Sequence, residues 1–208
     1  MKAFIYTGGR IDEKRITEKP REEDLVIAAD QGLLNAKKMG VTPSVLLGDL
    51  DSLAKSEKLP EGMEILQVPA EKDDTDTQLA VRVALERGAG ELVIVGGLDG
   101  RLDHTLSNLA ILEELSQKQI RAVMTSGQNR ARFIRNSGVI LLCDGFRYFS
   151  ILAADPTVKG VTVDGCKYPL KNAKLTRMRQ FAVSNEIVGN CALIEIKKGG
   201  AWVIESND

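Results

Sequence analysis

Three acidic segments of the chain carry residue types that suit a divalent cation. The first segment contains Asp49 and Asp51, with one residue between them, directly after an apolar run at residues 44–47. Carboxylate oxygens are hard ligands that Mg²⁺ and Ca²⁺ prefer. Because Asp and Gly also favour turns, this segment by itself fits an Asp-rich turn equally well.

The second acidic segment, Lys72-Asp73-Asp74-Thr75-Asp76, follows another apolar run and opens a predicted helix at residues 74–87. Helix capping explains one aspartate there, but three aspartates within four residues exceed what a cap uses. Asp76 shares a predicted helix face with Leu79 and Val83, so we expect it to point toward the sheet. Since an inward carboxylate without a partner is costly, we expect a metal or another cation beside Asp76.

The third segment extends from Gly96 to His104, between an apolar run and a predicted helix at residues 106–115. Glycines there allow backbone N–H groups to approach a phosphate closely, and a helix N-terminus adds partial positive charge. Arg101 offers a planar fork for phosphate oxygens. Asp103 could cap the helix, ligate a metal or do both. His104, the only histidine in the chain, fits an ordinary polar position in the first helical turn equally well.

Short apolar runs alternate with helical patterns over the first 125 residues. Runs typical of buried strands lie at residues 3–7, 25–29, 44–47, 65–68, 92–95 and 122–125, and helical patterns lie at residues 32–39, 74–87 and 106–115. This alternation predicts an α/β domain with a mostly parallel sheet and helices on both faces. Ligands of such sheets bind beyond the carboxyl ends of the strands, so we expect the three acidic segments to converge there.

Residues 126–208 show a different pattern. Short alternating segments lie at residues 132–134, 139–142, 148–152, 161–163, 192–196 and 202–204, with Gly, Pro, Asn and Asp between them. The absence of a helical pattern predicts an all-β second domain. We therefore divide the chain into residues 1–125 and 126–208, and we expect Trp202 in the core of the second domain.

The bulk composition argues against several classes of function. The 28 Lys and Arg residues nearly balance the 29 Asp and Glu residues, and no long basic run is present. Neither a nucleic acid nor a membrane is therefore expected as a partner. No apolar run reaches the ~18 residues of a membrane span, and the N-terminus lacks the layout of a signal peptide. Cys143, Cys166 and Cys191 form no zinc-like pairs, which favours free thiols in a reducing cytoplasm.

Convergence of the acidic segments would place many carboxylates and few positive charges at one sheet edge. Like charges at this density raise one another's pKa and destabilise the site, so a divalent cation is expected among them. With Lys72 and Arg101 nearby, the site suits Mg²⁺ carrying a polyphosphate, because Mg²⁺ binds through one or two carboxylates plus substrate phosphates. The chain contains neither the P-loop pattern nor the Rossmann G-x-G-x-x-G pattern, which argues against a P-loop enzyme and against NAD.

In their order along the chain, these segments resemble the thiamine pyrophosphokinase (thiamine diphosphokinase) family. The matching pieces, which cover nearly the whole chain, are Ala29-Asp30-Gln31-Gly32, Gly48-Asp49-Leu50-Asp51-Ser52, Lys72-Asp73-Asp74-Thr75-Asp76, residues 96–104, Asn108 and Ser184-Asn185-Glu186. The resemblance implies an α/β catalytic domain at residues 1–125 that binds ATP and Mg²⁺, and a β-sandwich domain at residues 126–208 that binds thiamine. It also implies transfer of the diphosphate of ATP to the hydroxyl of thiamine with release of AMP, and a homodimer whose active sites lie between subunits.

The resemblance further implies roles for individual residues. The metal site would comprise Asp49, Asp51, Asp73 and Asp76. The catalytic residues would be Lys72, Asp76, Arg101 and Asp103, and either Asp76 or Asp103 would orient the thiamine hydroxyl or accept its proton. The substrate-binding residues would be Asp30, Asp74, Thr75, Gly97, Asn108, Ser184 and Asn185, the last two contacting thiamine across the dimer. The chain departs from the family at Gln31, where Gly is frequent, and at Ile187 and Val188, where animal members have an aromatic ring.

Two rival interpretations use the same residues. Phosphatases of the haloacid dehalogenase type also begin with Asp-x-Asp after a strand, but they keep the pair after the first strand, whereas Asp49 and Asp51 follow a later one. A nucleotide-sensing module without catalysis would not need so many inward carboxylates. Turnover of ATP and thiamine would distinguish an enzyme of the resembled family from both rivals.

Overall fold

A computed structural model describes residues 1–48, 62–67 and 74–208 of the chain. The chain divides into two compact units. The first unit comprises residues 1–111 and 120–127, and the second comprises residues 112–119 and 128–208. The assignment of residues 1–125 and 126–208 to separate functions stays a prediction.

The first unit contains a six-stranded parallel sheet. Its strands are β1 (Lys2–Tyr6), β2 (Leu25–Ala29), β3 (Val45–Gly48), β4 (Glu64–Gln67), β5 (Glu91–Val95) and β6 (Arg121–Thr125), in the spatial order β4-β3-β2-β1-β5-β6. The strand order reverses between β1 and β5, whose carboxyl ends therefore diverge into loops on either side. Such a reversal creates a crevice where open α/β sheets bind ligands.

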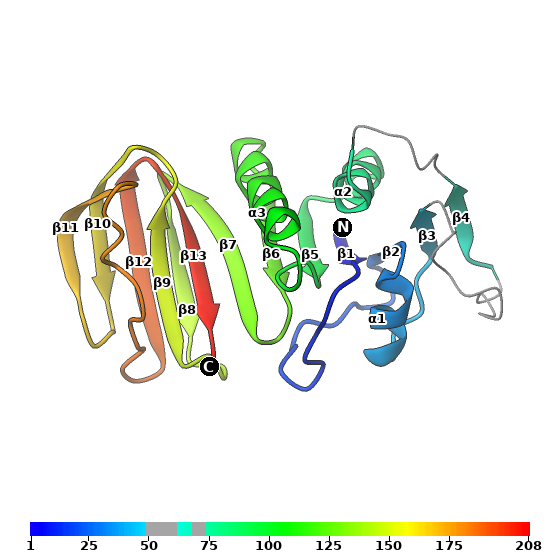
Figure 1. Ribbon diagram of the computed structural model, residues 1–208, viewed down its shortest axis with the longest axis horizontal. Helices are drawn as coiled ribbons and strands as arrows, with labels where there is room; N and C mark the ends of the chain where they lie inside the picture. Colours follow the sequence, from blue (N-terminus) through cyan, green and yellow to red (C-terminus); the bar gives the residue numbers. More distant parts are fainter. Residues whose placement is uncertain (49–61, 68–73) are drawn as a thin grey trace. The chain divides into compact units, whose positions relative to one another are not determined.

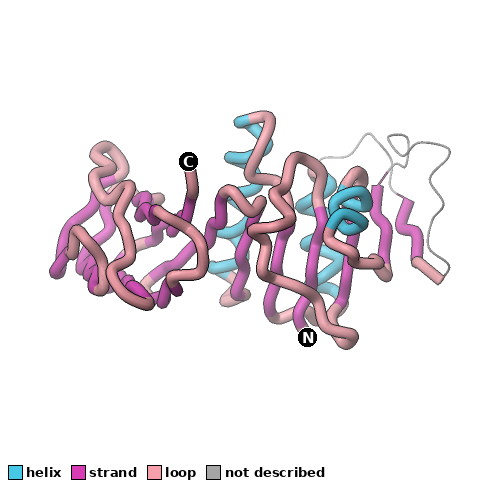
Figure 2. Tube along the Cα trace, turned by 90° about the horizontal axis from the view of Figure 1, so that it is seen from below, coloured by secondary structure: helices cyan, strands magenta, loops and turns pink. Residues whose placement is uncertain are grey.

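The apolar runs form strands because the sheet is covered on both faces. Figures 1 and 2 show α1 (Gly32–Lys38) on one face and α2 (Asp76–Glu86) on the other. The side chains of Ile5, Ile27 and Ile94 are fully buried, as expected for strands that have no solvent face. The predicted α/β fold with a mostly parallel sheet is confirmed.

Helix α2 is capped by a residue other than the aspartates. The Oγ1 of Thr75 accepts from the Gln78 N–H at 3.2 Å, and the Gln78 Oε1 accepts from the Thr75 N–H at 3.0 Å, which together form a capping box. The expectation that an aspartate serves as the cap is wrong. Asp76 lies in the first turn of α2, where its negative charge suits the helix dipole.

The second unit is an antiparallel β-sandwich, as the resemblance implies. One of its sheets has the order β7-β13-β9, and the other has the order β11-β10-β12-β8. The strands are β7 (Asn129–Arg135), β8 (Gly138–Leu142), β9 (Tyr148–Ala153), β10 (Thr157–Asp164), β11 (Leu170–Thr176), β12 (Cys191–Lys198) and β13 (Gly200–Ser206). Side chains from both sheets, including Ile151, Val161, Ile194 and Val203, form one apolar core.

Two features of the sandwich differ from the sequence-based expectation. Strand β11 has no counterpart among the predicted segments, because its exposed Lys171 and Lys174 hide the alternation. Lysines on a sheet edge discourage pairing with another chain. Trp202 is only half-buried and packs edge-to-face on Phe133 with ring centroids 5.6 Å apart, on the face of β13 opposite to the buried Ala201 and Val203.

The three cysteines are free, with Cys143 and Cys191 exposed. Among the helices in the described ranges, none is long and apolar enough to cross a membrane.

Candidate active site

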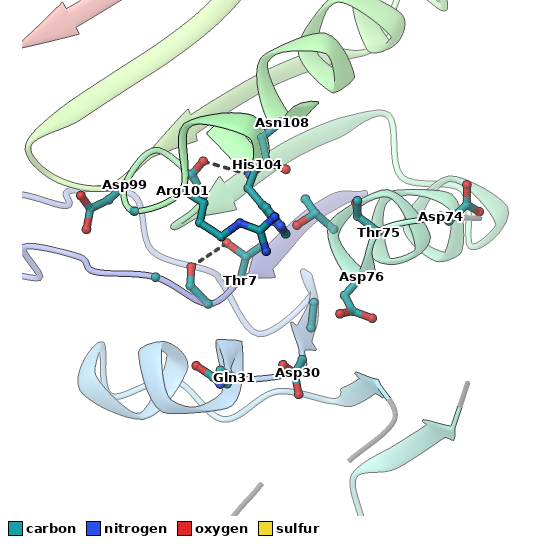
Figure 3. A pocket seen from close by; sticks show the side chains of 16 residues that line it. Thr7, Asp30, Gln31, Asp74, Thr75, Asp76, Asp99, Arg101, His104 and Asn108 are labelled. Atoms are coloured by element: carbon teal, nitrogen blue, oxygen red, sulfur yellow. Dashed lines mark hydrogen bonds between the residues drawn. The ribbon is translucent and has the colours of Figure 1, made fainter. Parts of the chain in front are cut away.

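A pocket of about 600 Å³ lies beyond the carboxyl ends of the strands in the first unit. Its walls come from the loops after β1, β2 and β5, from the start of α2 and from helix α3 (Leu102–Gln117). Figure 3 shows the side chains around it, and the lining residues within the described ranges are Thr7, Gly8, Gly9, Ala29, Asp30, Gln31, Asp74, Thr75, Asp76, Thr77, Gly97, Asp99, Gly100, Arg101, His104 and Asn108. The pocket thus occupies the crevice where the strand order reverses.

Two glycine-containing loops pack against each other on one side of the pocket. They are the 7–9 loop (Thr7, Gly8 and Gly9), which follows β1, and the 96–97 loop (Gly96 and Gly97), which follows β5. A Cβ at Gly96 would lie 2.6 Å from the Thr7 Oγ1 and 2.9 Å from the Gly8 carbonyl oxygen. Only glycine permits this close approach, and Gly8, Gly9 and Gly97 of the two loops line the pocket.

A buried asparagine fixes the 96–97 loop. Asn108 on α3 is 6% exposed, and its Nδ2 donates to the Gly97 carbonyl oxygen at 2.9 Å. Gly97 has a φ of 76°, and a Cβ there would lie 2.7 Å from the same Nδ2. Asn108 therefore fixes the orientation of the Gly97 carbonyl at the pocket wall, which both residues line.

Two half-buried carboxylates face the pocket from opposite elements. Asp30 follows β2 in a left-handed backbone conformation, with a φ of 49°, and Asp76 is the first residue of α2. Figure 3 shows their side chains directed at the same open space. Carboxylate oxygens in this position are ligands suited to Mg²⁺ or to the ammonium and hydroxyl groups of a substrate.

The other two candidates at the start of α2 make contacts within the helix. The Asp74 carboxylate accepts from Arg82 at 2.6 Å, and Thr75 is the helix cap described above. Both residues line the pocket. Any contact that Asp74 makes with a ligand would compete with this exposed ion pair, which is the weak kind of pair.

Arg101 and Asp103 form an exposed ion pair at the start of α3. Arg101 lines the pocket, whereas Asp103 is not among its described lining residues. Hydrogen bonds from Arg101 hold the pKa of the Asp103 carboxyl below its usual range. The neighbouring His104 lines the pocket as well and is exposed.

Four predicted site residues lie outside the described residues: Asp49, Asp51, Lys72 and Asp73. In the part of the chain that the structure describes, no group of three or more His, Cys, Asp or Glu side chains is arranged to hold a metal ion. The described donors, Asp30 and Asp76, are of the oxygen type that Mg²⁺ requires. Because Mg²⁺ binds through one or two carboxylates plus substrate phosphates, these two donors are compatible with a metal site in this pocket.

Ser184 and Asn185 belong to the second unit, and their contact with thiamine stays a prediction. Ser184 has a φ of 54° and is exposed. The Asn185 side chain is 8% exposed. Its Oδ1 accepts from the Tyr168 N–H at 3.0 Å, and its Nδ2 donates to the Tyr168 carbonyl at 2.9 Å and to the Cys166 Sγ at 3.3 Å. Burial raises the pKa of the Cys166 thiol.

The 7–9 loop lines the pocket but was not predicted from the sequence. Gln31 and Asp99 also line it, and although they lie in the segments that carry the resemblance, they had been assigned no role. The two consecutive glycines directly after the first apolar run are the signal that could have revealed the 7–9 loop, because it ends a parallel strand at the same sheet edge as the acidic segments.

Comparison with known proteins points to one family. The chain matches the model of the thiamin pyrophosphokinase catalytic domain over residues 18–124 and that of the vitamin B1 binding domain of thiamin pyrophosphokinase over residues 139–199. It is 30% identical over 191 residues to the thiamine pyrophosphokinase of Bacillus subtilis (strain 168). These residues cover 90% of this chain and 89% of that protein.

Solved structures agree with the sequence comparison. The fold is similar to the crystal structure of thiamine pyrophosphokinase from Bacillus subtilis, with a TM-score of 0.90 and 28% identity over 100% of both chains. It is also similar to that of thiamin pyrophosphokinase from Geobacillus thermodenitrificans, with a TM-score of 0.86 and 26% identity over 100% of this chain and 98% of that chain.

Proposed function

The chain belongs to the thiamine pyrophosphokinase family, and we propose how it transfers the diphosphate of ATP to the hydroxyl of thiamine. The products are thiamine diphosphate and AMP. The observation that carries the proposal is the pocket at the reversal of strand order, where two glycine loops, four aspartates and one arginine converge. Phosphoryl-type transfer depends mainly on positioning and charge neutralisation, for which these groups are suited.

ATP places its polyphosphate in this pocket. The 7–9 and 96–97 loops offer backbone N–H groups, and Arg101 offers a fork for phosphate oxygens. Asn108 keeps the Gly97 carbonyl from facing the negatively charged phosphates. Asp30, Asp74, Thr75 and Gly97 complete the nucleotide site.

Asp76, together with Asp49, Asp51 and Asp73, would hold Mg²⁺. The proposal is supported by the oxygen character of these donors and by the position of Asp76 on the pocket wall. When bound, Mg²⁺ neutralises charge on the polyphosphate.

The thiamine hydroxyl oxygen attacks the β-phosphorus of ATP. An O–P bond forms there, and the bond between the β-phosphorus and the oxygen that bridges it to the α-phosphorus breaks. That bridging oxygen leaves with AMP. Asp76 orients the hydroxyl and accepts its proton, because its carboxylate faces the pocket whereas Asp103 is not among the described lining residues. Lys72 and Arg101 stabilise charge on the transferring and leaving groups.

Thiamine contacts Ser184 and Asn185 of the second unit, and the enzyme is a cytoplasmic homodimer with shared active sites. Neither a nucleic acid nor a membrane is a partner, in line with the balanced charge of the chain. Mixing inactive Asp76→Asn chains with inactive Ser184→Ala chains tests the shared site. Mixed dimers would regain activity, and no rescue after confirmed subunit exchange would place each site within one chain.

The direct test is an assay of thiamine diphosphate formation. The product should form only when ATP, thiamine and Mg²⁺ are all present, and chelation of the metal should stop the reaction until Mg²⁺ is restored. Release of inorganic phosphate from ATP with unmodified thiamine would instead support a phosphatase. ATP binding without any turnover would support a sensing module.

A further inference from the structure

A second buried asparagine contacts the pocket wall from the side opposite to Asn108. Asn35 lies on α1 and is 3% exposed. Its Nδ2 donates to the Thr7 carbonyl oxygen at 2.7 Å and to the Gly9 carbonyl oxygen at 3.0 Å. Because both partners are carbonyl oxygens, only the NH₂ group of the amide can face them. Both of its hydrogens are therefore used by the 7–9 loop.

The close approach of α1 to β1 makes these two hydrogen bonds possible. A Cβ at Gly32, in the first turn of α1, would lie 1.9 Å from the Tyr6 carbonyl oxygen. No other residue could occupy this position without moving the helix outward. Gly32 thus brings Asn35, one turn later, within reach of the loop that follows β1.

All three carbonyl groups of the 7–9 loop are directed at protein atoms. The Thr7 and Gly9 carbonyl oxygens accept hydrogen bonds from Asn35. The Gly8 carbonyl oxygen lies against Gly96, 2.9 Å from the position that a Cβ of residue 96 would occupy. In a trans peptide the N–H points opposite to the C=O. The N–H of Gly8, in the same peptide as the Thr7 carbonyl, therefore points away from Asn35. It makes no hydrogen bond to any other residue in the described ranges.

We propose that Asn35 is a positioning residue for polyphosphate binding: it holds the Thr7 and Gly9 carbonyls out of the pocket so that the Gly8 N–H faces the phosphates. This inference rests on the proposed function, because it assigns the 7–9 loop to the phosphates of ATP. Asn35 fixes carbonyl groups of the 7–9 loop by hydrogen bonds, as Asn108 fixes the Gly97 carbonyl of the 96–97 loop. If either carbonyl turned inward, its partial negative charge would repel the anion.

Asn35→Leu and Asn35→Asp test the proposal, with Lys38→Ala on the exposed side of α1 as the matched control. Asn35→Leu removes the donor, and Asn35→Asp puts an acceptor opposite two carbonyl oxygens. Both should lower kcat/KM for ATP at least tenfold while KM for thiamine changes less than twofold, and Lys38→Ala should match wild type. Folded Asn35 variants that keep the wild-type kcat/KM for ATP, or that lose both substrates equally, would overturn the proposal.

The pH profile of Asn35→Asp separates positioning from a merely structural role. A buried carboxyl beside two carbonyl oxygens has a raised pKa, and its protonated form can donate one hydrogen to the loop. Between pH 8 and pH 6, its kcat/KM for ATP relative to wild type should therefore rise at least threefold, whereas the same ratio for Asn35→Leu should stay constant. If the relative kcat/KM for ATP changes with pH equally in Asn35→Asp and Asn35→Leu, Asn35 does not act as a hydrogen-bond donor.

A second pair of variants removes the donor group itself. Gly8→Pro eliminates the N–H, whereas Gly8→Ala keeps it and adds a methyl group that would meet the Gln31 Cβ at an ordinary 3.5 Å. ATP affinity, measured by calorimetric titration, should fall at least tenfold more in Gly8→Pro than in Gly8→Ala. Adding Asn35→Leu to Gly8→Pro should then change the affinity less than twofold.

Equal losses in the two Gly8 variants would overturn the inference even if the Asn35 variants fail to fold. If those variants fold, full additivity of Gly8→Pro and Asn35→Leu would overturn it as well. Calorimetric binding of ATP does not depend on turnover. If the wild-type chain binds ATP but makes no thiamine diphosphate, the proposed function is wrong, and the titrations still decide the role of Asn35.

Discussion

The guanidinium of Arg101 donates to both carboxylate oxygens of Asp103, from Nε to Oδ1 at 3.2 Å and from Nη2 to Oδ2 at 2.6 Å. The two side chains are 74% and 63% exposed. Exposed ion pairs contribute little net stability, so a phosphate can replace the carboxylate as the partner of Arg101 at small cost. In the proposed mechanism, Asp103 would keep Arg101 oriented at the edge of the pocket before ATP binds.

Removal of Arg101 should slow the reaction more than removal of its partner. Arg101→Ala loses the charge that stabilises the transferring phosphates, so kcat/KM for ATP should fall about 100-fold, equivalent to roughly 3 kcal/mol of transition-state stabilisation. Asp103→Asn should reduce it less than tenfold, because Arg101 remains. Steady-state kinetics of both variants tests this order. A larger loss in Asp103→Asn than in Arg101→Ala would make Asp103 the more important group.

Asp76→Asn should lower turnover by well over tenfold at saturating Mg²⁺, because it removes one negative charge from the proposed metal site. Removal of one such electrostatic interaction typically costs about 3 kcal/mol. Glu86→Gln is the matched control, since Glu86 is exposed at the other end of α2. Circular dichroism should show the same fold for both variants. Wild-type turnover in Asp76→Asn would show that the carboxylate has no part in the reaction.

The acid sensitivity of the second unit should depend on Asp155. Arg135 donates to both of its oxygens, at 2.8 Å and 3.0 Å, and holds the pKa of this carboxyl below its usual range. A lowered folded-state pKa contributes stability above the unfolded-state pKa of about 4, and this stability is lost as pH falls through the folded value.

Asp155→Asn should therefore reduce the free energy of unfolding by about 1–2 kcal/mol at pH 7 and by much less at pH 3. Urea unfolding at the two pH values measures the difference. If the effect of Asp155→Asn is equally large at both, the stability that Asp155 contributes does not depend on its charge.

Tyr6→Phe should stabilise the first unit. The Tyr6 side chain is fully buried, its hydroxyl has no hydrogen-bond partner among the described residues, and burial raises its pKa to about 12. An unsatisfied buried hydroxyl costs about 1–3 kcal/mol, so its removal should raise the free energy of unfolding by roughly 1 kcal/mol. Thermal or urea unfolding measures this, with exposed Tyr168→Phe as the neutral control. Marked destabilisation by Tyr6→Phe would reveal a partner for the hydroxyl.

The strands of the first unit could be predicted from the sequence because burial on both faces makes them continuous apolar runs. Residues 25–29 and 92–95 are such runs, and both lie within observed strands. Strand β11 could not be predicted, because it is an edge strand in which only Leu175 is buried. Its exposed positions carry polar residues, which discourage pairing with another chain at a sheet edge, and these residues give no alternating pattern.

Residue type and helical position pointed to Asp76, whereas Asp30 came from the family resemblance, and both residues line the pocket. The site was not predictable where the role of a residue depends on tertiary contact. Asn35 is one polar residue in a short amphipathic helix, and nothing in its neighbours along the chain indicates that its amide reaches the 7–9 loop. The role of Thr75 as the helix cap could not be predicted either, because the three aspartates beside it were equally good candidates.

Phosphorus NMR of a single reaction tests the central claim most directly. Attack of the thiamine hydroxyl on the β-phosphorus requires thiamine diphosphate and AMP to appear in equal amounts, with no thiamine monophosphate at any time. The resonances of the α-phosphorus in AMP and of the two coupled phosphorus atoms in thiamine diphosphate distinguish these products. Formation of ADP and thiamine monophosphate would show attack on the γ-phosphorus and contradict the account.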